Sequence, residues 1–152
     1  MRKIAILLAI SFILPGFLLA GENDDKETIK KVITSAYVNG LQNKGPVADI
    51  EAGFHPGFNL LGVRNDELTK WPIYSWIQYH EKKLKEDPSP PAKEDIVTSE
   101  FPLVDITGNA AIVKIELYKG GNMIFTDYLS LYKFEEGWKI VSKIYHRHEV
   151  KE

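Results

Sequence analysis

The chain has 152 residues, of which 44% are hydrophobic and 26% are charged, and this is the composition of one ordinary globular domain. Its formal net charge is only -2, and no basic cluster suited to neutralising phosphates is present, which argues against nucleic acid as a partner. The chain contains no cysteine, so a disulfide framework and a lipid-modified cysteine are both excluded.

Residues 1–20 have the pattern of a secretory signal peptide, with a basic start followed by an almost wholly apolar run. The chain becomes polar directly after Ala20, where we place the cleavage site. An uncleaved membrane anchor is the alternative, but the short run and Pro15 within it argue against a stable span. We therefore expect an exported protein, periplasmic or secreted, whose residues 21–152 form a single domain.

Two helices are predicted at the start of this domain. Apolar residues recur at spacings of three and four over 29–41, which lines one face of a long helix, and Asp24 is suited to cap its first turn. Gly45 and the proline after it end this helix. A short second helix is predicted over 47–52, because Gly53 readily stops a helix.

A hairpin and a third helix follow. Residues 58–63 and 68–71 look extended, and Asn65-Asp66 between them tolerates the positive φ angles of a tight turn. From Pro72 onward, apolar residues return to helical spacing. The proline-rich segment 87–91 cannot continue a helix, so we expect a surface linker there.

The last third of the chain predicts a meander of four antiparallel strands that begins near Ile96. Its turns are predicted at Gly108-Asn109, at Gly120-Gly121-Asn122 and at Glu136-Gly137. The second strand shows the clearest alternation, with four apolar residues on one face: Ala111, Val113, Ile115 and Leu117.

This order of elements resembles the nuclear transport factor 2-like superfamily over the chain from Lys26 to its end. The segments 54–58, 71–76 and 127–141 are similar to the branch labelled putative lumazine-binding. The resemblance implies an α+β, cone-shaped nuclear transport factor 2-like (cystatin-like) fold, in which a curved antiparallel sheet wraps around three helices. Such a cone commonly encloses a pocket, and the superfamily uses it for enzymes, binding modules and dimerisation platforms.

The resemblance also implies a test for the chemistry of ketosteroid isomerases, which belong to this superfamily. Those enzymes use a tyrosine on the first helix, a carboxylate base after the second helix and a protonated aspartate on the meander. Tyr37 matches the tyrosine, but the base falls at Gly62 and the aspartate falls at Ser130. Because glycine offers no proton acceptor and serine cannot replace a tuned acid, the sequence argues against this isomerisation.

Asp127 has two interpretations. Alternation places it on one strand face with Leu129 and Leu131, where burial could raise its pKa enough for general-acid work. The simpler alternative, which we favour, places it at the rim of the strand, where it meets a lysine or solvent. The opposite face of the same strand is the other candidate lining of a pocket, and it carries Tyr128, Ser130 and Tyr132.

The other pocket candidates are Tyr37, His55, Phe58 and Trp76. Tyr37 could present its hydroxyl to a cavity or be a core tyrosine with a satisfied hydroxyl. His55 precedes a proline at the entry to the hairpin, where it could act as an acid or base at the pocket mouth. Phe58 and Trp76 could stack on a flat ligand, although core packing also explains them.

The remaining histidines give no firm site. His146 and His148 share a face of the final strand, but no third ligand can be located, so we predict no metal site. His80 is on the inward face of its predicted helix, where a core histidine with a bonded ring is the ordinary explanation.

No nucleophile, dinucleotide or phosphate-binding motif is present, and we predict no cofactor. The leading hypothesis is an exported domain that binds a small aromatic or apolar molecule in its cone, without established catalysis. One alternative is an isomerase- or dehydratase-like enzyme that uses Tyr37, His55 and Asp127. The other is a structural module that forms a homodimer through an apolar patch of the meander.

Overall fold

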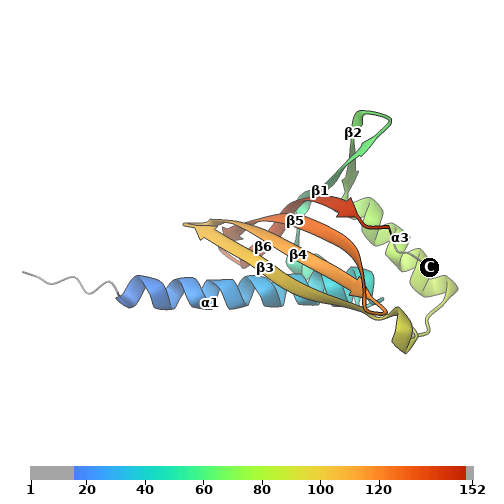
Figure 1. The fold of residues 1–152 in the computed structure, drawn as a ribbon, viewed down its shortest axis with the longest axis horizontal. Helices are drawn as coiled ribbons and strands as arrows, with labels where there is room; N and C mark the ends of the chain where they lie inside the picture. Colours follow the sequence, from blue (N-terminus) through green and yellow to red (C-terminus); the bar gives the residue numbers. More distant parts are fainter. Residues whose placement is uncertain (1–15, 150–152) are drawn as a thin grey trace, which may run out of the picture.

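The computed structural model describes residues 16–149, with side chains from Gly21 onward. Six strands form one curved sheet in the order β2-β1-β6-β5-β4-β3, and the long first helix lies along the concave side of this sheet (Figure 1). The α+β, cone-shaped fold with a curved sheet around three helices is confirmed. The sheet differs from a fully antiparallel one at a single pairing, because β1 runs parallel to β6.

Helix α1 (Gly16–Ile33) continues directly into a π-helix, η1 (Thr34–Gln42). Asp24 lies inside α1, so the prediction that it caps the helix is wrong. Of the predicted signal peptide, residues 1–15 lie outside the described residues, and the cleavage site after Ala20 falls within α1. No helix among the described residues is long and apolar enough to cross a membrane.

The predicted hairpin is confirmed, with longer strands than expected. Helix α2 (Val47–Gly53) leads into β1 (Phe54–Arg64), which pairs with β2 (Glu67–Pro72). Asn65 and Asp66 form the turn, with φ angles of 52° and 63°. The outer part of this hairpin projects beyond the rest of the sheet (Figure 1), and every residue of β2 is exposed.

Helix α3 (Ile73–Glu86) begins one residue after Pro72, which has an extended conformation. The linker is followed by a short 3-10 helix, η2 (Lys93–Asp95), which the sequence pattern did not predict. The meander then runs through β3 (Val97–Thr107), β4 (Ala110–Lys119), β5 (Asn122–Phe134) and β6 (Gly137–Arg147), with its turns at the predicted positions.

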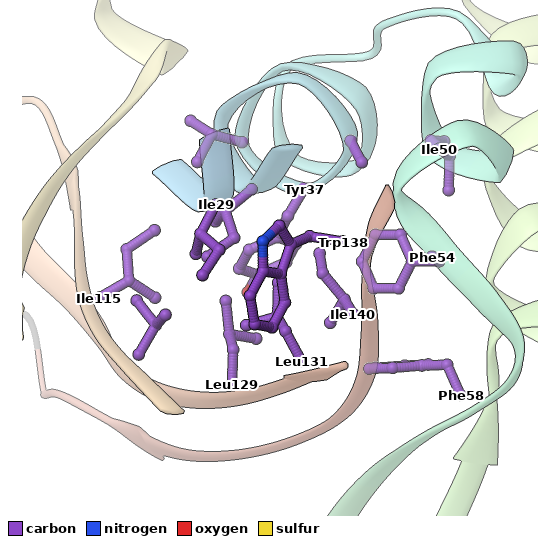
Figure 2. Close-up of a cluster of buried hydrophobic side chains, with 14 of the residues drawn as sticks. Ile29, Tyr37, Ile50, Phe54, Phe58, Ile115, Leu129, Leu131, Trp138 and Ile140 are labelled. Atoms are coloured by element: carbon purple, nitrogen blue, oxygen red, sulfur yellow. The ribbon is translucent and has the colours of Figure 1, made fainter. Parts of the chain in front are cut away.

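The core lies between the first helix and the concave face of the meander (Figure 2). Ile29 and Tyr37 face the sheet from the helix, while Leu129 and Leu131 of β5 face the helix, and all four are almost completely buried. The helices are also in close contact with one another: a Cβ added to Gly53 would lie 2.3 Å from the Cβ of Ala36. This packing holds η1, which carries Tyr37, against α2.

Candidate functional site

A cavity of about 190 Å³ opens between the π-helix, the helix α3 and the sheet. Its walls are mostly aromatic and apolar, and its polar groups come chiefly from the π-helix and β6. The residues that line it are Tyr37, Gln42, Leu60, Trp76, Phe125, Lys143, Tyr145 and Arg147. Lys143 and Tyr37 are buried, whereas Tyr145 and Arg147 are exposed, so the cavity has a buried end and an open end.

Three side chains form a closed hydrogen-bonded network at the buried end. The Tyr37 hydroxyl donates to Oδ2 of Asp127 at 2.5 Å. The ammonium group of Lys143 donates to the Tyr37 hydroxyl at 2.7 Å and to the same Oδ2 at 2.9 Å. Tyr37 and Asp127 are 0% exposed and Lys143 is 4% exposed, so this is a buried ion pair bridged by a phenol. We call these three residues the Lys-Asp-Tyr cluster.

A β-bulge turns Lys143 toward the inside of the cone. Leu131 pairs with Ile140, but the next residue of β5, Ser130, pairs with Ser142, so Val141 is an extra residue on β6. Uninterrupted alternation from Ile140 would place Lys143 on the outer face. The extra residue reverses the alternation, and Lys143 therefore points inward beside Leu129.

The same reversal brings Tyr145 inward beside Asp127. Four aromatic rings then surround the ammonium group of Lys143. Its Nζ atom lies 4.8 Å from the ring centroid of Tyr37, 5.1 Å from that of Tyr145, 5.6 Å from that of Trp76 and 5.8 Å from that of Phe125. Rings within about 6 Å attract a cation through their negative faces. The site is therefore built to hold positive charge at this nitrogen.

Burial also changes the pKa values of Tyr37 and Lys143. Burial raises the pKa of the Tyr37 hydroxyl well above its usual value, and the neighbouring Asp127 carboxylate raises it further. Burial lowers the pKa of Lys143, while attraction to Asp127 opposes that change. Tyr37 thus stays a neutral proton donor, and the amine of Lys143 becomes free at a lower pH than an exposed lysine.

The structure brings together three of the predicted site residues. Tyr37 and Trp76 line the cavity, and Asp127 lies beneath it with a lysine as its partner. The favoured interpretation of Asp127 as a residue at the strand's rim is wrong, because the side chain is completely buried, although the expected lysine partner is present. Phe58 is buried behind Trp76, and the two rings are stacked 6.2 Å apart.

The other predicted site residues lie elsewhere. The ring of His55 stacks on Phe134 at 4.7 Å, and its Nδ1 accepts a hydrogen bond from the backbone N–H of Gly57. The side chains of β5 on the face opposite Asp127 point out of the cone, where Ser130 and Tyr132 line a shallow depression. Tyr128 is on the same outer face and is 41% exposed.

The three remaining histidines lie in two different places, His80 on α3 and the pair His146 and His148 at the end of the chain's last strand. Nε2 of His80 lies 2.8 Å from the carbonyl oxygen of Gly45, which is the expected geometry of a core histidine that donates to the backbone. The rings of His146 and His148 are 4.8 Å apart, and His148 Nε2 lies 2.9 Å from the Thr126 hydroxyl. Within the described part of the chain, no three His, Cys, Asp or Glu side chains come together as metal ligands would.

The position that the isomerase comparison assigned to a base is also explained. A Cβ added to Gly62 would lie 3.5 Å from the Tyr145 hydroxyl and 3.3 Å from the Thr69 hydroxyl. A side chain there would be in close contact with both groups, and the Thr69 hydroxyl would have to shift by a few tenths of an ångström. The charged chemistry of this cone instead comes from Lys143, which the sequence analysis missed because only the bulge at Val141 points it inward.

Comparison with known proteins agrees with the architecture. Residues 24–146 match the model of the family described as "Putative lumazine-binding". The chain belongs to this family. A solved NTF2-like protein of unknown function from Shewanella baltica is similar in structure, with a TM-score of 0.65 and 27% identity. The match covers 84% of the present chain and 97% of the Shewanella protein.

Two further relatives are informative. An NTF2-like protein of unknown function from Methylobacillus flagellatus is 27% identical, with a TM-score of 0.62 over 83% of this chain and 94% of the other. An aldolase from a Cladobotryum species, FrzH, is 29% identical over 118 residues, which cover 76% of this chain and 87% of the aldolase. The chain is thus similar in structure to NTF2-like proteins of unknown function and similar in sequence to one enzyme.

The buried ion pair of Lys143 with Asp127 leads to a prediction about the stability of the fold. Replacing Lys143→Met leaves the Asp127 carboxylate buried without its cation, and we expect the free energy of unfolding to fall by about 3–5 kcal/mol. Urea unfolding followed by circular dichroism measures this change. The exposed pair of Lys133 with Asp25 supplies the control, because Lys133→Met removes a cation that is 47% exposed and should cost under about 1 kcal/mol.

A double variant separates the missing charge from lost packing. Asp127→Leu combined with Lys143→Met removes both charges, and it should recover most of the stability that Lys143→Met alone loses. Equal losses in Lys143→Met and Lys133→Met would contradict a buried ion pair at this site.

Proposed function

We propose that this domain binds a small carbonyl compound in the cavity of its cone and catalyses an aldol-type reaction on it. The observation that carries the proposal is the Lys-Asp-Tyr cluster, which gathers an amine, a carboxylate and a phenol at the buried end of an aromatic cavity. These groups supply the proton donors and the positive charge that carbon-carbon bond chemistry beside a carbonyl requires.

The geometry favours a carbonyl oxygen as the polar end of the ligand. Lys143 and Tyr37 both line the cavity, and their nitrogen and oxygen atoms are 2.7 Å apart. An oxygen placed beside them could accept a hydrogen bond from the Lys143 ammonium group while negative charge develops on it, and a second from the Tyr37 hydroxyl once that hydroxyl turns away from Asp127. Asp127 lies behind these two residues, and we assign it the role of holding their orientation and their charge.

The size and walls of the cavity limit the ligand. A volume of about 190 Å³ is below the range of roughly 300–1,000 Å³ that encloses drug-sized ligands, so a small molecule is favoured. Leu60, Trp76 and Phe125 supply apolar and aromatic contacts for the part of the ligand that carries no oxygen. This agrees with the expectation of a small ligand with an apolar or aromatic part.

The similarity to an aldolase supports the choice of an enzyme over a purely binding domain. The enzyme alternative from the sequence relied on Tyr37, His55 and Asp127. We retain Tyr37 and Asp127, and we replace His55 with Lys143, because His55 is stacked on Phe134. A binding domain without catalysis would use the same cavity but would not require the amine.

Ligand binding tests the proposal. A panel of small ketones, aldehydes and oxo acids is added to the full-length protein, and stabilisation is measured by thermal shift and calorimetry. A compound present at 100 times its Kd should stabilise the fold by about 2.7 kcal/mol. Tyr37→Phe should weaken binding of the best compound roughly tenfold, because one hydrogen bond of about 1–1.5 kcal/mol is lost.

Tyr132→Phe is the matched control for this experiment. It removes the same hydroxyl from the outer face of the sheet, where Tyr132 is 48% exposed, and it should leave the affinity unchanged. Equal effects of the two variants would place the ligand outside the cavity. A panel in which no compound binds would refute the proposed function.

We also propose that the protein is exported and that its first 20 residues are removed. The basic start and the apolar run of the N-terminus motivate this proposal. When the full-length chain is expressed with its own N-terminus in a bacterial host, the mature protein recovered outside the cytoplasm should begin at Gly21. Intact-mass spectrometry measures the start of the chain, and an uncut chain retained in the cell would contradict the proposal.

A second candidate function is assembly as a homodimer through the outer face of the sheet. Large apolar side chains on neighbouring strands are exposed on this face, and we call them the outer-face patch: Leu103, Ile112, Tyr128, Tyr132 and Ile144. The register places Tyr128 directly beside Ile144. Exposed patches of this kind mark surfaces that a partner covers, and a second copy would bury the same patch symmetrically.

Sedimentation tests the dimer. At micromolar concentration the wild-type protein should sediment as a dimer, and Ile144→Glu should convert it to a monomer by placing a charge in the outer-face patch. Val63→Glu is the control, because Val63 is 76% exposed on the projecting hairpin and lies outside the outer-face patch. A monomeric wild type would refute the assembly.

A further inference from the structure

We infer that Lys143 is a nucleophilic amine that forms a covalent imine with the carbonyl carbon of a small aldehyde or ketone. This inference rests on the proposed function and deepens it, since it names the bond that the enzyme makes to its substrate. It also separates the proposal from simple binding, in which the same amine would act only as a hydrogen-bond donor.

The position of the amine supports a covalent role. Lys143 is 4% exposed, yet it is one of the residues that line the cavity. Two of its three ammonium hydrogens are directed to Tyr37 and Asp127, at 2.7 Å and 2.9 Å. No acceptor among the described residues takes the third hydrogen, and once the amine has passed its proton to Asp127, rotation about the Cε–Nζ bond turns the lone pair toward the cavity. A carbonyl carbon can therefore approach the nitrogen from that side.

The surrounding rings stabilise the positively charged imine that the reaction forms, as they stabilise the starting ammonium group. An ammonium group and a protonated imine carry the same positive charge on the same nitrogen. The four rings within 5.8 Å and the Asp127 carboxylate would therefore stabilise both species. A surface lysine lacks this arrangement, and its imine would exchange freely with water.

The Lys-Asp-Tyr cluster can donate and accept every proton that moves during formation of the imine. The ammonium proton moves from Nζ to Oδ2 of Asp127, and the free amine attacks the carbonyl carbon to form a C–N bond. The electron pair of the C=O bond moves to the oxygen, which takes a proton from the amine through the Tyr37 hydroxyl. Asp127 then returns its proton to this oxygen, the C–O bond breaks, and water leaves. A protonated imine and a carboxylate remain.

The protonated imine would serve the aldol-type reaction directly. It withdraws electrons from the neighbouring carbon, so a proton moves from that carbon to Asp127 through the Tyr37 hydroxyl more easily than it would from the free carbonyl compound. The resulting enamine carbon attacks a second carbonyl carbon to form the C–C bond, and the oxygen of that carbonyl group takes the proton back from Asp127. Water then hydrolyses the imine, which releases the product and the Lys143 amine. The geometry thus gives the amine, the phenol and the carboxylate separate roles in one sequence.

Several charged or titratable groups face the amine across the cavity. They are Asp127 on β5, Tyr37 on η1, and Tyr145 and Arg147 on β6. Burial lowers the pKa of Lys143, so the free amine should be present at a lower pH than for an unfolded chain, whose lysines have a pKa of about 10.4. The rate of adduct formation should rise with pH and level off below that value.

The experiment uses 2,4-pentanedione as the probe, because this small diketone forms a stable enaminone with a reactive amine. The full-length protein is incubated with the probe near neutral pH, and the near-ultraviolet absorbance of the enaminone is followed. Peptide mass mapping then locates the adduct. We expect Lys143 to be labelled before any other lysine of the chain, and Lys143→Arg to lose this fast labelling.

Lys139→Arg is the matched control. Lys139 lies on the same strand, but its Nζ donates a hydrogen bond to the backbone carbonyl of Ala52 at an exposed position outside the cavity. This variant should label as fast as the wild type. Circular dichroism checks that Lys143→Arg is folded, and Tyr37→Phe should slow labelling without abolishing it. Loss of labelling in a folded Lys143→Arg together with normal labelling of Lys139→Arg would establish the reactive amine.

Two results would overturn the inference, and they differ in what they mean for the proposed function. Equal labelling of the wild type and Lys143→Arg, or no fast labelling of either, would refute the formation of an imine at Lys143. If small carbonyl compounds still bind in the cavity in that case, the binding proposal stands without the covalent step. If no carbonyl compound binds to the wild type, both proposals fail.

Discussion

The hydrogen bonds and charge attraction that join Lys143, Asp127 and Tyr37 are the interaction on which the inside of this domain depends. A lysine and an aspartate are costly to bury unless each has a partner. Here Oδ2 of Asp127 accepts hydrogen bonds from both the Lys143 ammonium group and the Tyr37 hydroxyl, and the ammonium group also donates to that hydroxyl. Oδ1 of Asp127 is buried and receives no hydrogen bond from the described residues. Replacement of a buried ion pair by apolar residues of similar size is often close to neutral in stability, so the stability of the fold does not by itself require this cluster.

The fold holds this cluster by two departures from regular geometry. The π-helix η1 presents Tyr37 to the sheet, and π-helical turns are often found at functional sites. The bulge at Val141 presents Lys143 to the same point from the opposite side. Core packing of Ile29, Leu129 and Ile140 then fixes both elements, as Figure 2 shows for the surrounding side chains.

Most of the architecture could be predicted from the sequence, because local chemistry determines it. The turns of the meander need Gly or Asn, the hairpin turn needs Asn65-Asp66, and the apolar spacing of 29–41 fixes the first helix. The site could be predicted only in part. Regular periodicity predicted that Tyr37 and Asp127 face inward, but the favoured interpretation placed Asp127 at the exposed rim because most carboxylates are exposed. Lys143 could not be predicted, because its facing depends on a bulge that no local sequence pattern indicates. The outer-face tyrosines were reasonable candidates, but only the curvature of the sheet shows which face is enclosed.

The extra residue in β6 has a consequence for how this site can be lost. If the strand kept Val141 but paired without the bulge, the one-residue slip would reverse the facing of every later residue, so Ser142 and Ile144 would enter the cone and Lys143 would turn to solvent. Deletion of the codon for Val141 would instead remove only the extra residue and would leave Lys143 opposite Leu129, facing inward. A charged cavity and a plain apolar interior therefore differ in this scaffold by a slip of one residue, without a change to any side chain that takes part.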